Sequence, residues 1–574
     1  MPRLEGPESS WVTAALCGLP VVLYFVFFFS FAVNIPFGDD YPVLGFAVNF
    51  TNPSWPDKLP LLFSLHNEHR IVTLRLLVLF LHSLSLKINL VAVGFLANLS
   101  LVGIALLLAK SLDLKGPPPD ASIGWRSRSL RLMPIFLLLF QPHHYQMTLW
   151  AMCAFTNLVV YFFAFLSLYL LVHSRSTLAF AGAVFCAALG AYTNGNGIFT
   201  FFIGALVLLL GKRYRWLWKW AATGFFFVGF YFLGYSRNPQ HPSLIPYLKQ
   251  HVWPTVEYFL STAGALGDFG TLRPYVSVMV GGLMLVGLIL LIKKKIYRHN
   301  VFLSSAIVFV SLSLAALTAT RAPFGVGQSF EPRYRFASVL LLVLLYLGLL
   351  ETARNKKAVL CFFLAFSLLF SAASFCLDFR SGRAYRNVLV ANLLEWNGGK
   401  AALPYTNPEH AENILRLAVK RGIFETPKRW AIDRPKYPFG ALDRREDAGA
   451  GTSTGIVFSG WALDDSGRLR IMVRRTRLPS DGQSGIDRGG LVYVGQARLK
   501  KGSVPLIAQI YYGFPGTDRM LWEYRFGPAE LAAGQEPEKL YFFARDRVGH
   551  ETLIGEAVLS GNAETPKYQG NGET

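Results

Sequence analysis

Two adjacent carboxylates, Asp39 and Asp40, follow the first long apolar run of the chain, within Gly38-Asp39-Asp40-Tyr41-Pro42. Carboxylates beside a membrane-crossing segment are costly unless they are solvated or functional. A general base in this position would accept the proton of a hydroxyl group as its oxygen attacks an anomeric carbon. The neighbouring negative charge and partial burial would raise the pKa of such a base towards neutrality. The alternative is a polar turn where a helix leaves the membrane.

A second polar group is the string His66-Asn67-Glu68-His69-Arg70. The two histidines are three residues apart, which differs from the H-E-x-x-H pattern of zinc peptidases. We therefore do not favour a divalent metal here and predict no metal ligands. We interpret His66, Glu68 and His69 as lining a substrate cleft. The alternative is a patch at the membrane surface whose long side chains reach towards water.

A third set of polar residues lies at two turns between apolar runs. His143, His144 and Gln146 form one turn, and Tyr192 and Asn194 begin a second that is rich in Asn and Gly. Polar groups at membrane depth usually face a bundle interior or a wet cavity. We predict that these five residues bind substrate. For Asn157, in the helix after the first turn, helix packing through hydrogen bonds is the alternative,.

The fourth group is Glu331-Pro332-Arg333-Tyr334-Arg335, which follows Arg321. Arginine is suited to phosphate because its planar guanidinium offers a fork of donors. A sugar that leaves from a lipid phosphate needs cations where the departing phosphate gains charge. A base, a sugar cleft and an arginine clamp would together make a transferase site. An ordinary anchor at the membrane interface is the alternative for these arginines.

These residues must be positioned by membrane helices. Hydrophobic residues make up 52% of the 574, and they cluster in runs. Runs of roughly 17–23 residues are long enough to cross a bilayer. The net charge of +21 would suggest nucleic acid in a soluble protein,. Here many cations lie in short loops such as 212–215, 293–295 and 356–357, which is the positive-inside pattern,. We expect a multi-pass protein of the plasma (inner) membrane and no nucleic-acid partner.

Placing the basic loops in the cytoplasm predicts about eleven transmembrane helices. They are expected near 12–34, 88–109, 131–141, 149–172, two on either side of 192–197, 216–234, 275–292, 301–319, 336–351 and 358–377. The apolar stretch 71–86 would break the alternation of basic and less basic loops. We predict that it is a re-entrant or surface helix on the outer face.

The composition changes after the last apolar run. We predict a transmembrane catalytic domain over 1–378 with an outer loop at 35–87, and an extracytoplasmic connecting segment over 379–450. The latter contains an amphipathic helix from Pro408 to Lys420,. Short alternating runs near 456–458, 469–473, 491–494, 540–543 and 552–554 predict a β-sandwich domain over 451–560,. We expect a disordered tail over 561–574.

The acidic pair after helix one, the long outer loop ending in a His/Arg-bearing helix, and the Arg-Tyr element before a late span resemble the GT-C superfamily. These are polyprenyl-phosphate-sugar-dependent membrane glycosyltransferases, and the resemblance covers roughly residues 10–378. It implies Asp39 as general base with Asp40 in support, and phosphate binding by Arg333, Arg70 or Arg335. This chain has Asp-Asp where Asp-Glu is commoner, and the subfamily is not identified.

We therefore expect a glycosyltransferase that moves a sugar from a polyprenyl phosphate to a glycan or glycolipid of the cell envelope. Its active site and C-terminal domain would be extracytoplasmic, and no cofactor is required by this interpretation. One alternative is a transporter or flippase of lipid-linked sugars, although such proteins carry charges within spans. Others are a polymerase or ligase using diphosphate-linked oligosaccharides, and a glycan-binding scaffold with Trp461, Tyr511 and Tyr512 as stacking residues.

Overall fold

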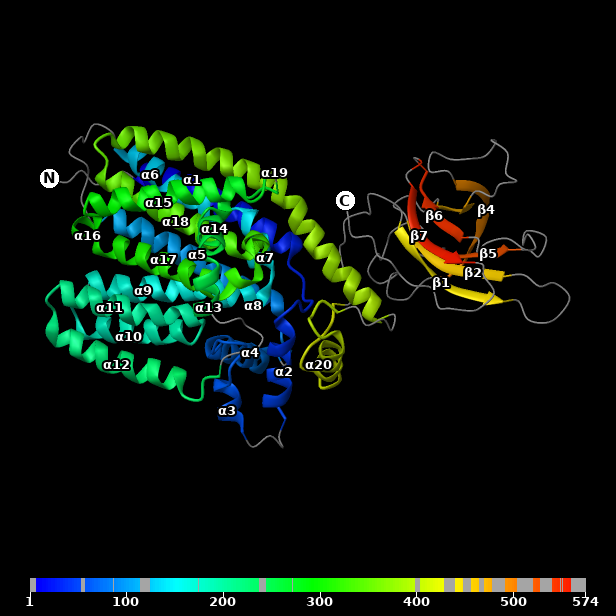
Figure 1. Cartoon of the computed structure of the whole chain (residues 1–574), viewed down its shortest axis with the longest axis horizontal. Coiled ribbons are helices and arrows are strands. Elements are labelled where there is room, and N and C mark those ends of the chain that lie inside the picture. Colours follow the sequence, from blue (N-terminus) through cyan, green and yellow to red (C-terminus); the bar gives the residue numbers. More distant parts are fainter. Residues whose placement is uncertain are drawn as a thin grey trace. The chain divides into compact units, whose positions relative to one another are not determined.

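The computed structural model describes most of the chain and shows a helical bundle and a separate sheet (Figure 1). The described residues are 7–52, 57–85, 87–113, 124–173, 175–236, 244–270, 272–397, 403–427, 439–447, 456–463, 469–476, 491–502, 520–526, 539–547, 549 and 551–558. The chain divides into two compact units, Met1–Thr426 and Pro427–Thr574. The predicted tail 561–574 lies outside the described residues, as do Tyr511 and Tyr512.

Six segments of the described chain are helical, long and apolar enough to cross a membrane. The helices that form them are α5 (Leu90–Asp113), α8 (Ala151–Ala154) with η2 (Phe155–Val159) and α9 (Val160–His173), α15 (Tyr275–Lys293), α17 (Val301–Arg321), α18 (Arg335–Thr352) and α19 (Lys356–Asn397). Figure 1 shows these helices side by side with roughly parallel axes. Their apolar side chains form one continuous core. A bundle of this kind satisfies its backbone polar groups internally, as lipid requires.

Five further helices form where spans are predicted, but they are not among these six candidates. They are α1 (Pro7–Phe31), α6 (Gly124–Leu139), α10 (Thr177–Ala191), α11 (Phe199–Leu210) and α12 (Tyr214–Phe232). Two helical segments extend beyond prediction: α6 begins before residue 131 and α19 continues past residue 377 to Asn397. The helical character of these regions agrees with the sequence, whereas the number of spans stays a prediction.

Several short helices gather at the end of the bundle where α1 ends; we call it the α2 end (Figure 1). They include α2 (Asp40–Phe50), α3 (Lys58–Phe63), α4 (Val72–Ser85) and α20 (Pro408–Lys420). Helix α20 is confirmed as amphipathic, with Ala411, Ile414, Leu415 and Ala418 buried. Helix α4 covers the stretch predicted to lie on the membrane surface. Its 14 residues span only about 21 Å, which is too short for a hydrocarbon core of about 30 Å.

The remaining helical segments are short connections. They are η1 (Pro142–His144), α7 (Tyr145–Leu149), η3 (Gly195–Ile198), α13 (Leu244–Gln250), α14 (Val252–Ala263), η4 (Ala265–Gly267), α16 (Ile296–His299), η5 (Ala322–Phe324), η6 (Val326–Phe330) and η7 (Pro332–Tyr334). Three of them, η1, α7 and η7, contact one another and pack against α18 or α19. They carry several of the predicted site residues.

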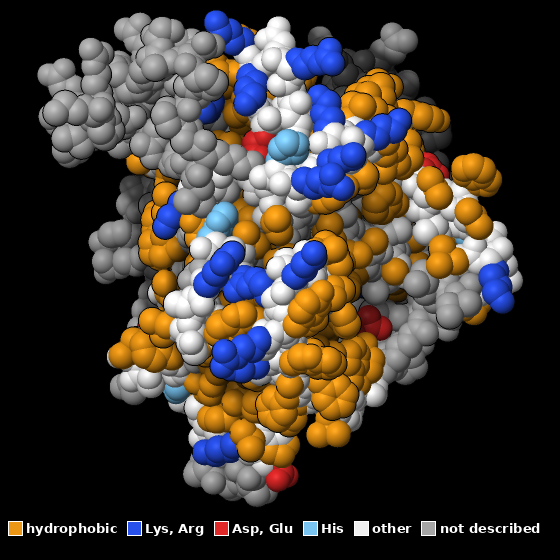
Figure 2. All heavy atoms as spheres, turned by 90° about the vertical axis from the view of Figure 1, so that its left-hand side faces the viewer, with side chains coloured by type: hydrophobic (Ala, Val, Ile, Leu, Met, Phe, Trp, Pro, Cys, Tyr) orange, Lys and Arg blue, Asp and Glu red, His pale blue; other side chains and the backbone are white. Residues whose placement is uncertain are grey.

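The end of the bundle at which α16 lies is rich in cations. Figure 2 views this face, and Lys and Arg side chains gather across it. Hydrogen bonds bring basic segments together here: Lys294 donates to the carbonyl of Thr352, and Arg213 donates to that of Leu171. The sequence pattern of basic loops therefore corresponds to one end of the bundle rather than to scattered sites.

The C-terminal unit is a seven-stranded antiparallel sheet in the order β1-β2-β5-β4-β3-β6-β7. The strands are β1 (Phe439–Asp447), β2 (Ile456–Leu463), β3 (Arg470–Thr476), β4 (Leu491–Lys500), β5 (Leu521–Phe526), β6 (Lys539–Arg545) and β7 (Glu551–Val558). Five of them coincide with predicted runs. Strand β1 falls inside the segment that we assigned to the connection, and β5 was not predicted.

The predicted β-sandwich is wrong, because the strands form one continuous barrel-like sheet. Strand β4 is long enough to pair with β3 along Leu491–Ala497 and with β5 along Arg498–Lys500. It therefore joins what would have been two separate sheets. The sheet also curls until β1 lies against β7, where Gly555 approaches the side chain of Leu442. Alternating burial predicts strands but does not distinguish a sandwich from a curled sheet.

The core of this sheet gives a direct test of the register. Phe542 is fully buried, with its ring 5.2 Å from those of Phe458 and Trp522, whereas Phe543 points outwards under Arg474. We expect Phe542→Ala to destabilise the C-terminal unit by about 3–5 kcal/mol. Phe543→Ala is the matched control, and its effect should be about 1 kcal/mol or less. Limited proteolysis of the full-length chain measures both, and equal sensitivity of the two variants would contradict this register.

Candidate active site

A cavity of about 320 Å³ lies at the α2 end of the bundle. Its charged and imidazole groups are Asp39, His66, Glu68, His69, Arg321 and Arg333. Its amide and hydroxyl groups include Asn157, Asn194, Asn196, Ser313 and Thr320. Apolar residues such as Phe199, Ala316 and Leu317 complete the wall where α11 meets α17. The cavity therefore combines ionic, polar and apolar surfaces in one space.

The carboxylate pair is placed by a sharp turn after α1. Gly38 has φ +51°, and its N–H donates to the carbonyl of Pro404. A Cβ atom at Gly38 would lie 2.8 Å from the Trp150 ring, so only glycine fits this turn without displacement,. Asp39 then faces the cavity, while Asp40 turns into the protein and is 2% exposed.

Asp40 links α2 to the membrane helix that begins at Ala151. Its two carboxylate oxygens accept hydrogen bonds from the N–H groups of Phe37 and Met152, at 3.1 and 2.9 Å. Met152 lies in the first turn of α8, where backbone N–H groups have no partner within the helix,. Asp40 therefore supplies a missing acceptor to α8 and fixes α2 beside it.

The two carboxyl groups have different electrostatic environments. Burial would raise the pKa of Asp39, but the nearby His66 imidazole and the Arg333 and Arg321 guanidiniums outweigh it and hold the pKa below its ordinary value. Burial raises the pKa of Asp40 to about 7 despite its two N–H donors, and the charge of Asp39 adds to the rise. Asp39, which faces the cavity, is therefore the more readily ionised of the two, and its lowered pKa is the opposite of the rise that the sequence predicted.

A tight turn carries the second group of cavity residues. His66 and His69 exchange backbone hydrogen bonds of 2.7 and 2.9 Å, and Asn67 between them adopts φ +51°. Asparagine tolerates this left-handed conformation better than most residues. The turn brings His66 Nε2 to 3.7 Å from Asp39 Oδ1. Gly195 lies against His69, where a Cβ atom would come within 2.8 Å of Nδ1, so the glycine lets the two turns pack.

Arg70 anchors this turn to the protein. Its guanidinium donates to the backbone carbonyls of Phe63, Tyr231 and Leu233, and its side chain lines a different cavity. Arg75, one turn further along α4, likewise donates to carbonyls of Leu61, Leu62 and Ser64. These contacts use three of the five N–H donors of Arg70 and hold its side chain outside the candidate site,. Among the described residues, the arginines that line the candidate site are Arg321 and Arg333.

Arg333 lies between two aromatic rings at the cavity wall. Its guanidinium carbon is 5.5 Å from the Trp150 ring centre and 5.1 Å from that of Tyr334. Stacking of this kind fixes the plane of the guanidinium. Its Nε atom is buried and has no hydrogen-bond partner among the described residues. An anion in the cavity would supply one.

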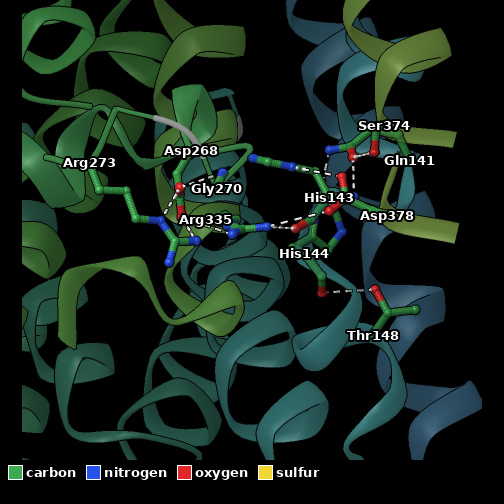
Figure 3. Close-up of polar contacts among 10 residues, drawn as sticks. All are labelled: Gln141, His143, His144, Thr148, Asp268, Gly270, Arg273, Arg335, Ser374 and Asp378. Atoms are coloured by element: carbon green, nitrogen blue, oxygen red, sulfur yellow. Dashed lines mark hydrogen bonds and ion pairs between the residues drawn. The ribbon is translucent and has the colours of Figure 1, made fainter. Parts of the chain in front are cut away.

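A buried ionic network surrounds Arg335, two residues further on (Figure 3). Its guanidinium donates to Asp268 at 2.9 Å and lies 3.5 Å from Asp378. Arg273 forms a fork of two hydrogen bonds with Asp268, at 2.6 and 2.8 Å. His143 Nδ1 is 2.9 Å from the other oxygen of Asp378. We call these five residues the Arg335 network, and two arginines balance its two carboxylates.

The histidines of this region are neutral and inaccessible. Burial and the charge of Arg335 lower the pKa of His143, although Asp378 partly offsets them. Burial, with the charges of His143 and Arg335, lowers the pKa of His144 to about 3. Both residues are fully buried. The pKa of Asp268 is held below its ordinary value because Arg273 and Arg335 outweigh the effect of its burial.

The cavity therefore collects six of the thirteen predicted site residues: Asp39, His66, Glu68, His69, Asn194 and Arg333. Asp40 lies directly behind it. Six others lie outside the lining: Arg70, His143, His144, Gln146, Tyr192 and Arg335. The Tyr192 hydroxyl donates to the carbonyl of Phe227, and Gln146 is half-buried. Sequence analysis missed Asp268, Asp378 and Arg273, although each lies beside an apolar run, as Arg335 does.

No group of three or more His, Cys, Asp or Glu side chains within the described part of the chain could hold a metal ion. No known protein family, curated protein or solved structure matches this chain in the comparisons made. The chemistry of the site must therefore be argued from its own geometry.

The Arg335 network predicts a stability difference between two arginines. Arg335→Met would leave two buried carboxylates short of a partner, and breaking a buried pair costs about 3–5 kcal/mol. Arg273→Met is the matched control. Its side chain is 41% exposed, and we expect a loss of about 1 kcal/mol because solvent weakens the pair. Thermal unfolding in one detergent compares them, and a larger loss for Arg273→Met would contradict the network.

The environment of Asp40 predicts a pH dependence of stability. Its pKa of about 7 in the folded protein exceeds its ordinary value of 3.8. Between these values the folded state keeps a proton that the unfolded state has released, so stability falls as the pH rises through this range. Asp40→Asn should remove that fall, but it should also lower stability at all pH values, because an amide offers only one acceptor oxygen. Unfolding midpoints of the wild type and of Asp40→Asn, measured across this pH range, test the prediction. An unchanged pH slope in the variant would contradict the assignment.

Proposed function

We propose that this protein is an integral membrane glycosyltransferase that moves a sugar from a polyprenyl-phosphate donor to a glycan or glycolipid of the cell envelope. The observation that carries the proposal is the cavity in which Asp39 and His66 share one space with Arg321 and Arg333. Such a site offers a proton acceptor and cations for a departing phosphate, which are the two requirements of this transfer.

The cavity wall supports a division of roles. Arg333 and Arg321 are suited to the lipid phosphate, whose charge grows as the anomeric C–O bond breaks. Asn157, Asn194 and Asn196 can hydrogen-bond sugar hydroxyls, and the Asn196 Oδ1 atom has no partner among the described residues. The apolar wall at Phe199 and Leu317 suits the first carbons of a lipid. Asp39 would accept the proton of the attacking hydroxyl.

The orientation follows from the basic end of the bundle. If the face in Figure 2 is cytoplasmic, as the positive-inside rule requires, the cavity opens at the extracytoplasmic side,. About eleven spans and a GT-C architecture in the plasma (inner) membrane fit this arrangement. The C-terminal sheet would then be extracytoplasmic as well, because α19 is an odd-numbered span.

The test uses the full-length protein in lipid nanodiscs with a panel of polyprenyl-phosphate sugars and crude envelope glycan. We expect release of polyprenyl phosphate by the wild type. Asp39→Asn should reduce it by about 10²-fold or more, since general bases contribute about 10²–10⁴-fold. Asp57→Asn is the matched control, because Asp57 is an exposed carboxylate in the same loop. It should leave the rate unchanged.

Three results would contradict the proposal or its assignment of Asp39. If the wild type releases no polyprenyl phosphate with any donor of the panel but moves lipid-linked sugars between leaflets, a flippase would be favoured. Turnover of diphosphate-linked oligosaccharides that survives Asp39→Asn would favour a polymerase or ligase. Equal losses for Asp39→Asn and Asp57→Asn would remove Asp39 from the chemistry.

A further inference from the structure

His66 and Asp39 form an unusual pair inside the candidate site. Their facing atoms, Nε2 and Oδ1, are 3.7 Å apart. This separation exceeds a hydrogen bond, for which about 2.7–3.2 Å is typical. The Nε2 atom is buried and has no hydrogen-bond partner among the described residues. Most buried polar atoms are satisfied, so an exception in a cavity requires an explanation.

Both side chains are held by structure that does not depend on their own contact. The backbone bonds between His66 and His69 close the turn, and Arg70 fixes its base to three carbonyls. On the other side, Gly38 is bonded to Pro404 and Asp40 is bonded to α8. The gap between the two atoms therefore results from the fold around them.

An oxygen atom can lie about 2.8 Å from both atoms, at the apex of a triangle whose base is their 3.7 Å separation,. A hydroxyl there has a single hydrogen and donates it to Asp39 Oδ1, while Nε2, without a hydrogen of its own, lies beside the same oxygen as the next proton acceptor. The acceptor hydroxyl of the proposed transfer is the group that must meet a base in this cavity.

We propose that the acceptor hydroxyl binds between Asp39 and His66, and that its proton comes to rest on His66. His66 is then a catalytic residue rather than a wall of the sugar cleft. This inference rests on the proposed function and deepens it, because it assigns the proton of that reaction to two side chains instead of one.

In this transfer one bond forms at the anomeric carbon and one bond breaks. The acceptor oxygen forms a bond to the anomeric carbon, and the bond from that carbon to the phosphate oxygen breaks. The electron pair leaves with the lipid phosphate, beside Arg333 and Arg321. The hydroxyl proton passes to Asp39 and on to His66 Nε2, which becomes an imidazolium beside a carboxylate. Imidazole is the side chain that most readily gains a proton near neutral pH, whereas Asp39 is held as a carboxylate by its neighbours.

The charges around His66 are compatible with this role. Asp39 from the turn before α2 and Glu68 from its own turn would stabilise an imidazolium, while Arg333 from η7 and Arg321 from α17 oppose it. His69, Tyr161, Tyr334 and Cys153 are the other titratable groups of the lining. When the phosphate binds, its negative charge offsets the arginine charges that oppose the imidazolium formed by the transfer.

The test compares His66→Gln with wild type, using whichever donor the wild type turns over. We expect kcat to fall by about 10²-fold. The KM for the donor should change little, because the lipid phosphate binds elsewhere in the cavity. His251→Gln is the matched control, since His251 is exposed and stacks on Tyr247 outside the cavity. It should behave as wild type.

Azide separates proton transfer from folding. Azide has no proton to lose, so it can attack the anomeric carbon without a base and yield a glycosyl azide. With azide, His66→Gln should approach the wild-type rate of polyprenyl-phosphate release. A variant that stays equally slow with azide would overturn the proposal, and so would one that matches wild type with the natural acceptor. In both cases the glycosyltransferase assignment would stand. If the wild type released no polyprenyl phosphate with any donor, both the glycosyltransferase assignment and the role of His66 would be contradicted.

Discussion

The buried charges around Arg335 constrain the whole α2 end of the bundle. Two carboxylates and a guanidinium, each almost inaccessible to solvent, can coexist there only if each is paired,. The partners come from four elements: Asp268 follows η4, Arg335 begins α18, Asp378 lies on α19, and His143 belongs to η1. A shift of any one element would leave a charge unpaired at a cost of several kcal/mol. The network therefore fixes these elements together, and Arg333 is held two residues from its centre.

Polar groups in this protein differ in whether their partners are complete. Arg70 and Arg75 donate to three backbone carbonyls each, and Arg335 is paired with two carboxylates. In the cavity, Arg333 Nε and Asn196 Oδ1 have no partner among the described residues, and the buried Nε atoms of Arg75 and Arg335 have none either. Unsatisfied groups at a cavity wall retain bonding capacity for a ligand. Arg333 therefore differs from the structural arginines in its position at the cavity and in the absence, within the described part of the chain, of carbonyl or carboxylate partners of the kind that hold Arg75 and Arg335.

Sequence reasoning located the helices because long apolar runs have few alternatives in lipid. It also identified Asp39, His66, Glu68 and Arg333, whose polar character is conspicuous beside those runs. It did not anticipate the carboxylate partners of Arg335 and His143, because a guanidinium or imidazole that faces a buried carboxylate has the same local sequence as one that faces a cavity. It placed strands such as Ile456–Leu463 but not the closure of the sheet, which depends on β4 pairing with two neighbours. Long-range pairing of this kind leaves no periodic signal.

Two sequence motifs share one arrangement at this site. In His66-Asn67-Glu68-His69-Arg70 the imidazole faces the cavity and the final arginine is bound to carbonyls behind it. In Glu331-Pro332-Arg333-Tyr334-Arg335 the first arginine faces the cavity and the last is bound to carboxylates. Each short segment thus presents side chains to the cavity and is held by a final arginine that hydrogen-bonds to the protein behind it. Because a flexible turn would lose conformational entropy on binding, an anchor within five residues keeps the reactive group in place before substrate arrives. An arginine suits this anchoring role because one side chain can satisfy several acceptors at once.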